Sequence, residues 1–87
     1  LDMKHQMQTL RQAKELAEQG KTVLLVVHDI DQAMNTADEL VLMNKGNVII
    51  QGTPEEVYFS GKIDEVFSVS LNRVHTGKGW RYFCEEV

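Results

Sequence analysis

Residues 22–33 read TVLLVVHDIDQA, and this stretch decides how the rest of the chain is interpreted. It begins with an unbroken β-branched and aliphatic run, the pattern of a strand that is covered on both faces. Such strands belong to parallel sheets packed between helices. The run stops at His28, and Asp29 followed by Gln32 has the spacing of a helix start. We therefore predict a buried strand over 22–27 and a helix directly after it.

Helical periodicity precedes this stretch. Apolar residues three and four positions apart predict one amphipathic helix, which Asp2 would cap and Gly20 would end. The stripe includes Met3 and Met7, which we expect to face a core, as we do Met34 of the next helix.

Two hairpins and two short helices are predicted after it. Apolar runs on either side of Asn44-Lys45-Gly46-Asn47 predict a β-hairpin. Thr53-Pro54-Glu55-Glu56 is a capping box with proline in the first turn, and a further helical turn follows Gly61. Alternating residues over about 69–86 predict a terminal hairpin. The expected order is αβαββααββ.

Composition limits the class of protein. The chain has 87 residues with 9 basic and 13 acidic side chains, so its net charge is 9 − 13 = −4. This charge argues against a non-specific nucleic-acid binder. The single cysteine, Cys84, excludes an internal disulfide framework and suits a reducing compartment. We expect Cys84 to be a small core residue and not a nucleophile.

The fold class is α/β, and two interpretations remain open. A doubly covered strand needs hydrogen-bonded neighbours, and this chain encodes few of them. One interpretation is an α+β fragment, the C-terminal piece of a larger α/β domain that begins before Leu1. The other is a complete small α+β domain in which the first hairpin flanks the strand.

His28 is the main candidate for chemistry. Ligands of open α/β sheets bind at the carboxyl ends of strands, and His28 is the first polar residue after the apolar run. Its imidazole could donate a hydrogen bond to a phosphate or position water. Alternatively, it closes the strand by bonding a backbone carbonyl. Asp29 is interpreted as a cap, and Asp31 and Glu39 as solvated surface. No zinc site is inferred from His5, His28, His75 and Cys84.

The ordered combination of 22–33, residues 37–46 (ADELVLMNKG) and residues 52–57 (GTPEEV) resembles the ATPases of ATP-binding-cassette (ABC) transporters. The resemblance covers about residues 1–67. The tail from Val74 to Gly79 is similar to the ends of iron-chelate and cobalamin importer ATPases. The chain is thus expected to be the C-terminal portion of an ABC ATPase domain of the P-loop NTPase type, spanning 1–87.

The resemblance implies specific roles. His28 would be the H-loop residue that contacts the γ-phosphate of ATP, and Asp2 would end the D-loop and face the partner subunit. The intact subunit would use ATP and Mg²⁺ and would drive substrate import. Its partners would be a second ATPase subunit and a membrane permease, with no nucleic acid. It would be cytoplasmic and peripheral on the inner face of the membrane.

Other family motifs are absent from the sequence. It contains no GxxxxGK[ST] phosphate loop, no LSGGQ signature, no Q-loop and no strand that ends in the catalytic Asp-Glu pair. Phosphoryl transfer depends on these parts for positioning and charge neutralisation. We therefore expect the isolated chain to bind no cofactor tightly and to hydrolyse no ATP. If it is a fragment, it should leave the faces that flank residues 23–27 partly uncovered, and we expect it to self-associate to cover them.

Two rival functions are kept. One is a self-contained, non-enzymatic α+β module that acts through protein contacts. The other, a small hydrolase using His28 with Asp29, is the weakest, because adjacent residues point apart and no nucleophile lies nearby.

Overall fold

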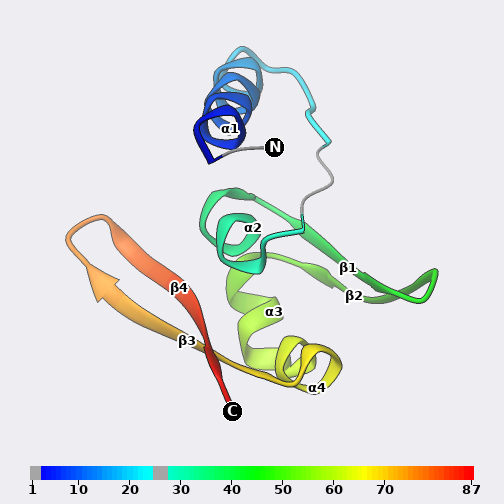
Figure 1. Ribbon diagram of the computed structural model, residues 1–87. Coiled ribbons are helices and arrows are strands. Elements are labelled where there is room, and N and C mark those ends of the chain that lie inside the picture. The colour runs from blue at the N-terminus through cyan, green and yellow to red at the C-terminus, as the bar shows by residue number, and fades with distance from the viewer. Residues whose placement is uncertain (1–2, 25–27) are drawn as a thin grey trace.

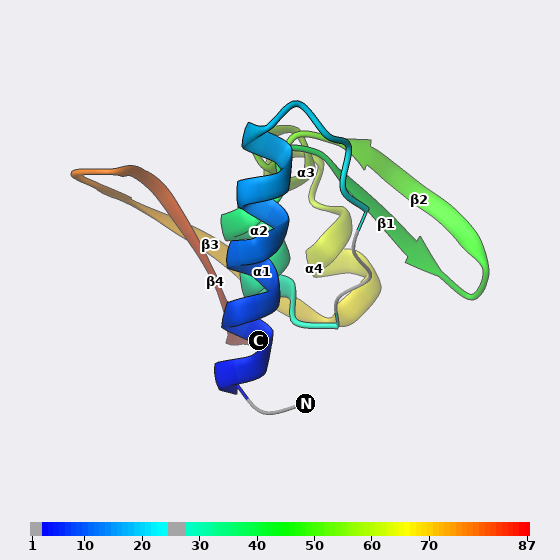
Figure 2. The same cartoon turned by 90° about the horizontal axis from the view of Figure 1, so that it is seen from above.

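The computed structural model describes residues 3–24 and 28–87, and it has a mixed helix-and-strand fold (Figure 1). Within these described ranges, four helices and two hairpins follow one another: α1 (Met3–Glu18), α2 (Ile30–Thr36), β1 (Leu40–Asn44), β2 (Asn47–Gly52), α3 (Pro54–Ser60), α4 (Lys62–Phe67), β3 (Val69–Thr76) and β4 (Gly79–Glu86). The two hairpins project to opposite sides of a centre made by α2, α3 and α4, as Figures 1 and 2 both show.

The strand predicted over 22–27 is not found in the described part of the chain, so the order αβαββααββ is not confirmed. Residues 21–24 have no regular secondary structure, and 25–27 lie outside the described residues. Leu24 is 88% exposed. The physical reason is the lack of a partner: the strands that the structure describes pair only within two antiparallel hairpins, and a strand that is buried on both faces needs parallel neighbours.

The predicted hairpins are both confirmed. In β1–β2, Leu40 pairs with Gly52, and the register shifts between Leu42 and Met43. The connecting Lys45 and Gly46 have φ of 51° and 80°, which is the turn conformation that matches the twist of paired strands. In β3–β4, Val69 pairs with Glu86 and the register is unbroken to the tip.

One small core lies between α2, α3, α4 and the β3–β4 hairpin. Its members are each less than a tenth exposed: Met34, Val57, Ile63, Leu71 and Tyr82. Met34 thus faces the core as expected. The same expectation for Met7 was wrong, because that side chain is 59% exposed. The reason is that none of the α1 side chains that the structure describes belongs to this core; the side chain of Met3, also expected there, is not among them. The helix ends as predicted, with Gly20 at φ 86°.

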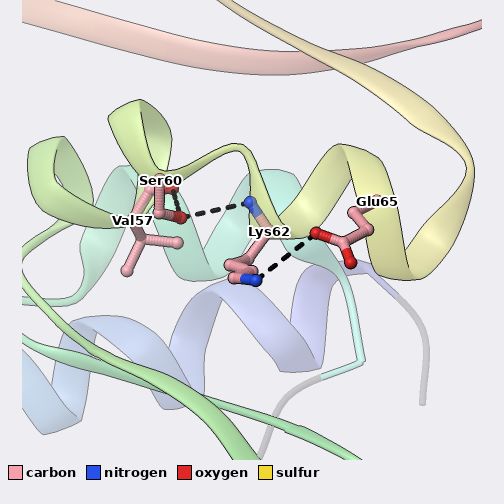
Figure 3. Close-up of polar contacts among 4 residues, drawn as sticks. All are labelled: Val57, Ser60, Lys62 and Glu65. Carbon is pink, nitrogen blue, oxygen red and sulfur yellow. Dashed lines mark hydrogen bonds and ion pairs between the residues drawn. The ribbon is translucent and has the colours of Figure 1, made fainter.

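Short helices α3 and α4 are joined by a tight polar turn (Figure 3). The Ser60 hydroxyl donates to Val57 O at 2.7 Å and accepts from Lys62 N at 3.1 Å. Lys62 Nζ lies 3.4 Å from Glu65 Oε2. Gly61, at φ 71°, ends α3 and begins α4, a left-handed conformation that favours glycine. The turn therefore brings Val57 and Ile63 into the same core.

Candidate functional site

His28 lies at a bend directly before the second helix. Its side chain is exposed, and no described residue forms a hydrogen bond with its ring. The next residue, Asp29, is the N-cap of α2, and its Oδ1 accepts from Gln32 N at 3.2 Å. This cap was predicted from the spacing and is confirmed. The imidazole is therefore open to an external partner, while the backbone just beyond it is held by a capped helix.

Asp2, the D-loop candidate, lies outside the described residues. Of the two predicted site residues, the structure therefore describes His28 alone, and it does not relate His28 to Asp2.

Two polar side chains of α2 hold the outer edge of β4. Asn35 Nδ2 donates to Tyr82 O at 2.9 Å, and Tyr82 N donates to Asn35 Oδ1 at 2.7 Å. Cys84 N donates to Asp31 Oδ1 at 3.1 Å. The expectation that Asp31 is solvated surface was therefore wrong, because its carboxylate is half-buried and occupied by a strand amide. Glu39 is exposed as expected, and it accepts from Gln51 Nε2 at 2.7 Å.

The opposite edge of the sheet is closed in the same way. Leu71 N donates to Asp64 Oδ1 of α4 at 2.8 Å. Carboxylate and amide groups thus occupy strand-edge positions on both sides of β3–β4, which blocks pairing with another chain there. Sequence reasoning missed these contacts, because they join residues up to 53 positions apart.

Cys84 lies against the core and beside Asp31. Burial raises the pKa of the thiol to about 11, and hydrogen bonding and charge repulsion from Asp31 add to the rise. At neutral pH the thiol is therefore protonated and a poor nucleophile. This supports the expectation that Cys84 is a packing residue.

Arg73 forms an aromatic cluster that sequence reasoning also missed. Its guanidinium carbon lies 3.9 Å from the Trp80 ring centroid, 4.8 Å from Tyr58 and 4.7 Å from Phe59. Nη1 lies 3.2 Å from Glu55 Oε1. If a two-residue turn at 77–78 is assumed from the sequence, the hairpin register pairs Arg73 with Tyr82 and places Trp80 diagonally across from Arg73. Part of this cluster was therefore predictable from the hairpin register. The contacts of Arg73 therefore hold α3, which carries Glu55, Tyr58 and Phe59, against the terminal hairpin.

Other kinds of site are not supported in the described ranges. Residues 3–24 and 28–87 contain no group of histidine, cysteine and carboxylate side chains that could hold a metal ion. None of the described helices is long and apolar enough to cross a membrane. A shallow hollow lies where α4 meets β3, but His28 does not line it.

The fold and site define a mixed α/β chain whose exposed histidine precedes a capped helix, and known proteins are similar to it in sequence. No protein-family model matches the chain. It is 41% identical over 68 residues to the hemin import ATP-binding protein HmuV of Plesiomonas shigelloides, which covers 78% of this chain and 26% of that protein. It is 33% identical over 72 residues to the petrobactin import ATP-binding protein YclP of Bacillus subtilis, covering 82% of this chain and 29% of that protein.

A third relative is the hemin import ATP-binding protein HmuV of Chelativorans sp. (strain BNC1), 41% identical over 71 residues, with 82% of this chain and 27% of that protein covered. These matches place the chain among the importer ATP-binding proteins of the ABC family, as the resemblance of its motifs implied. The chain spans between a quarter and a third of the length of the curated relatives it matches.

Proposed function

We propose that this chain is the C-terminal segment of the ATP-binding subunit of an ABC importer. The observation that carries the proposal is the identity of 33–41% to import ATP-binding proteins over about four fifths of the chain. The relatives are named for hemin and petrobactin import, so we extend the same kind of cargo to the intact subunit. In that subunit, ATP binding and hydrolysis drive import.

His28 is the residue through which the segment contributes to the nucleotide site. Its exposed ring has an N–H that can donate to a phosphate oxygen, which fits the γ-phosphate contact of the H-loop. When bound, ATP supplies the phosphoryl group, and Mg²⁺ neutralises its charge. Asp2 belongs to the D-loop and faces the second ATPase subunit. The remaining contacts come from parts of the subunit that this sequence does not encode, so the isolated chain is inactive.

The partners and location of the intact subunit follow from the same proposal. A second copy of the subunit closes the nucleotide sites, and a membrane permease receives the motion. The subunit therefore works in the cytoplasm on the inner face of the membrane.

Two experiments test this function in turn. The coding sequence upstream of Leu1 should contain a GxxxxGK[ST] phosphate loop and an LSGGQ-type signature. In the intact subunit, His28→Ala should lower the rate of ATP hydrolysis by roughly 10²-fold or more, the usual effect of removing one positioned donor from a charge that develops in the reaction. His75→Ala, a second exposed histidine on β3, is the matched control and should keep the wild-type rate. An unchanged rate for His28→Ala would refute the assigned role.

The exposed apolar surface supports the segment interpretation. Leu24 is 88% exposed, and one face of β1–β2 leaves Val41, Met43 and Val48 each about half-exposed. Each 100 Å² of apolar surface left in water forfeits about 2.5 kcal/mol. We infer that further parts of the subunit cover these side chains, and that the isolated chain self-associates to do so.

The rival function, a self-contained and non-enzymatic α+β interaction module, makes the opposite prediction. Such a module should sediment as a monomer and melt in one sharp transition. A segment should show a sedimentation coefficient that rises with concentration and a broad melt. Sedimentation velocity over a range of concentrations, together with thermal unfolding, separates the two.

A further inference from the structure

The terminal hairpin is attached to the helix that follows His28 by side chains of that helix. Asn35 bonds both backbone groups of Tyr82, at 2.7 and 2.9 Å, and Asp31 accepts from Cys84 N at 3.1 Å. Asn35 Nδ2 also donates to the backbone carbonyl of Asp31 at 2.8 Å, which fixes the Asn35 amide on the preceding turn of α2. Figure 1 shows α2 and β4 lying side by side. The attachment therefore uses one face of a helix and one strand edge.

Besides these bonds, Ile30 at the start of α2 packs against the core, together with Met34. The helix has seven residues, Ile30–Thr36, and its one fully buried side chain is Met34. Short helices gain most of their stability from tertiary packing and not from their own propensity. Asp31 is only three positions from His28, so a shift at β4 reaches the histidine through the first turn of α2 and its N-cap, Asp29.

We propose that Asn35 and Asp31 are positioning residues, through which the β3–β4 hairpin sets the location of His28. The proposal deepens the proposed function and rests on it only for the identity of the group that His28 contacts. The hairpin then influences the nucleotide site without contacting the nucleotide. Its edge contacts hold α2, and α2 holds the imidazole where a ring N–H can donate a hydrogen bond to a phosphate oxygen.

The linkage is tested by NMR of the labelled histidine rings in the 87-residue chain, at a concentration at which sedimentation velocity shows it to be monomeric. Asn35→Ala should shift the His28 ring resonances and speed amide exchange in α2 by about threefold to tenfold, because the net contribution of such bonds is modest. His75 is the internal reference, because its ring centroid lies 4.9 Å from that of Trp80 within the β3–β4 hairpin. Its resonances should stay in place. Asn72→Ala, which removes an amide on β3 that bonds Ser70 and Glu85, is the matched control and should leave His28 unchanged.

A variant that loses its fold is distinguished by the reference ring. If Asn35→Ala moves both His28 and His75, Asn35→Asp replaces it, since that side chain still accepts from Tyr82 N but cannot donate to Tyr82 O. A smaller shift confined to His28 then supports the linkage. An unmoved His28 ring in a folded Asn35 variant overturns it.

A second measurement separates this inference from the proposed function. In the intact subunit, Asn35→Ala should lower kcat for ATP hydrolysis by roughly tenfold to a hundredfold with little change in KM, as expected when a reacting geometry is displaced. If His28→Ala leaves turnover unchanged, the proposed function fails, whatever the NMR result. If His28→Ala abolishes turnover but Asn35→Ala does not lower kcat, the positioning role alone fails.

Discussion

Asn35 in α2 pairs with Tyr82 in β4 as a neighbouring strand would. The side-chain amide donates to Tyr82 O at 2.9 Å and accepts from Tyr82 N at 2.7 Å, although the two residues are 47 positions apart. A strand edge presents a row of backbone donors and acceptors that would otherwise be free to pair with another chain. The amide fills this edge with a group of the same geometry, so α2 and the terminal hairpin form one unit.

Replacing Asn35 by alanine should lower the free energy of unfolding by about 1–3 kcal/mol. The loss exceeds that of an ordinary surface change because both backbone groups of Tyr82 lose their partner, and Tyr82 belongs to the core. Urea unfolding followed by circular dichroism measures it. Asn72→Ala, on the neighbouring strand, should cost less, about 0.5–1 kcal/mol, because its amide bonds a nearby carbonyl and an exposed carboxylate and holds no strand edge. Equal losses for the two variants would contradict the edge-pairing role.

Arg73→Lys should destabilise the terminal hairpin even though the charge is kept. The guanidinium carbon lies 3.9–4.8 Å from the ring centroids of Tyr58, Phe59 and Trp80, and an ammonium cannot stack on rings as the planar guanidinium does. The expected loss is about 1–2 kcal/mol. Urea unfolding monitored by Trp80 fluorescence reports it directly.

The ion pair of Arg73 provides the control for this prediction. The Glu55 side chain is 62% exposed, so Glu55→Gln should cost less than about 1 kcal/mol. A larger loss for Glu55→Gln than for Arg73→Lys would show that charge pairing, and not ring stacking, holds the cluster together.

The capping box of α3 makes stability depend on pH in the acid range. Hydrogen bonds from the backbone and side chain of Thr53 lower the pKa of Glu56 below its ordinary value of 4.5. Because the folded-state pKa is the lower one, this stabilisation is present above the ordinary value and is lost as pH falls through the lowered pKa. Urea unfolding at a series of acid pH values should show the loss, and Glu56→Gln should remove this part of it.

Thr53→Ala tests the same box from its other side and should cost about 1 kcal/mol near neutral pH. Thr53 N donates to Glu56 Oε1 at 2.9 Å, and Glu56 N donates to Thr53 Oγ1 at 3.2 Å, so the two residues act together. The double variant should therefore lose less than the sum of the single losses. Strict additivity would mean that the reciprocal bonds are not formed.

Local signals in the sequence predicted local structure well. The Thr53-Pro54-Glu55-Glu56 start, the Asp29 cap, the left-handed Gly20 and both hairpins are all confirmed. Each of these depends on residues close to one another in the chain, where side-chain chemistry acts on the adjacent backbone. The candidate His28 was found in the same way, as the polar residue that ends an apolar run.

Features that depend on distant partners were not predictable in this way. An apolar run such as 22–27 becomes a strand only beside other strands, and residues 21–24 are irregular where none is paired with them. Asp31 was expected in solvent because nothing near it in sequence shows that Cys84 N needs an acceptor. The long-range pairing of α2 with β4 therefore required the structure.

Cys84 should resist thiol reagents at neutral pH. Burial first, and Asp31 second, raise the pKa of its thiol from 9.0 to about 11, so the thiolate forms only in strongly alkaline solution. The rate of alkylation by iodoacetamide should rise with pH toward that value. Asp31→Asn should lower the midpoint, because it removes the negative charge beside the sulfur. The urea-unfolded chain should titrate near 9.0 and serves as the control.

The raised pKa of Cys84 also fixes the sign of the alkaline stability change. Between about 9 and 11 the unfolded chain loses the thiol proton while the folded chain keeps it, so the folded state binds more protons. The thiol's contribution to stability is therefore full below 9.0 and declines as pH rises toward 11. Cys84→Ala should remove this decline in urea unfolding at alkaline pH. A wild-type thiol that alkylates as fast folded as unfolded at pH 8 would show that neither burial nor Asp31 protects it.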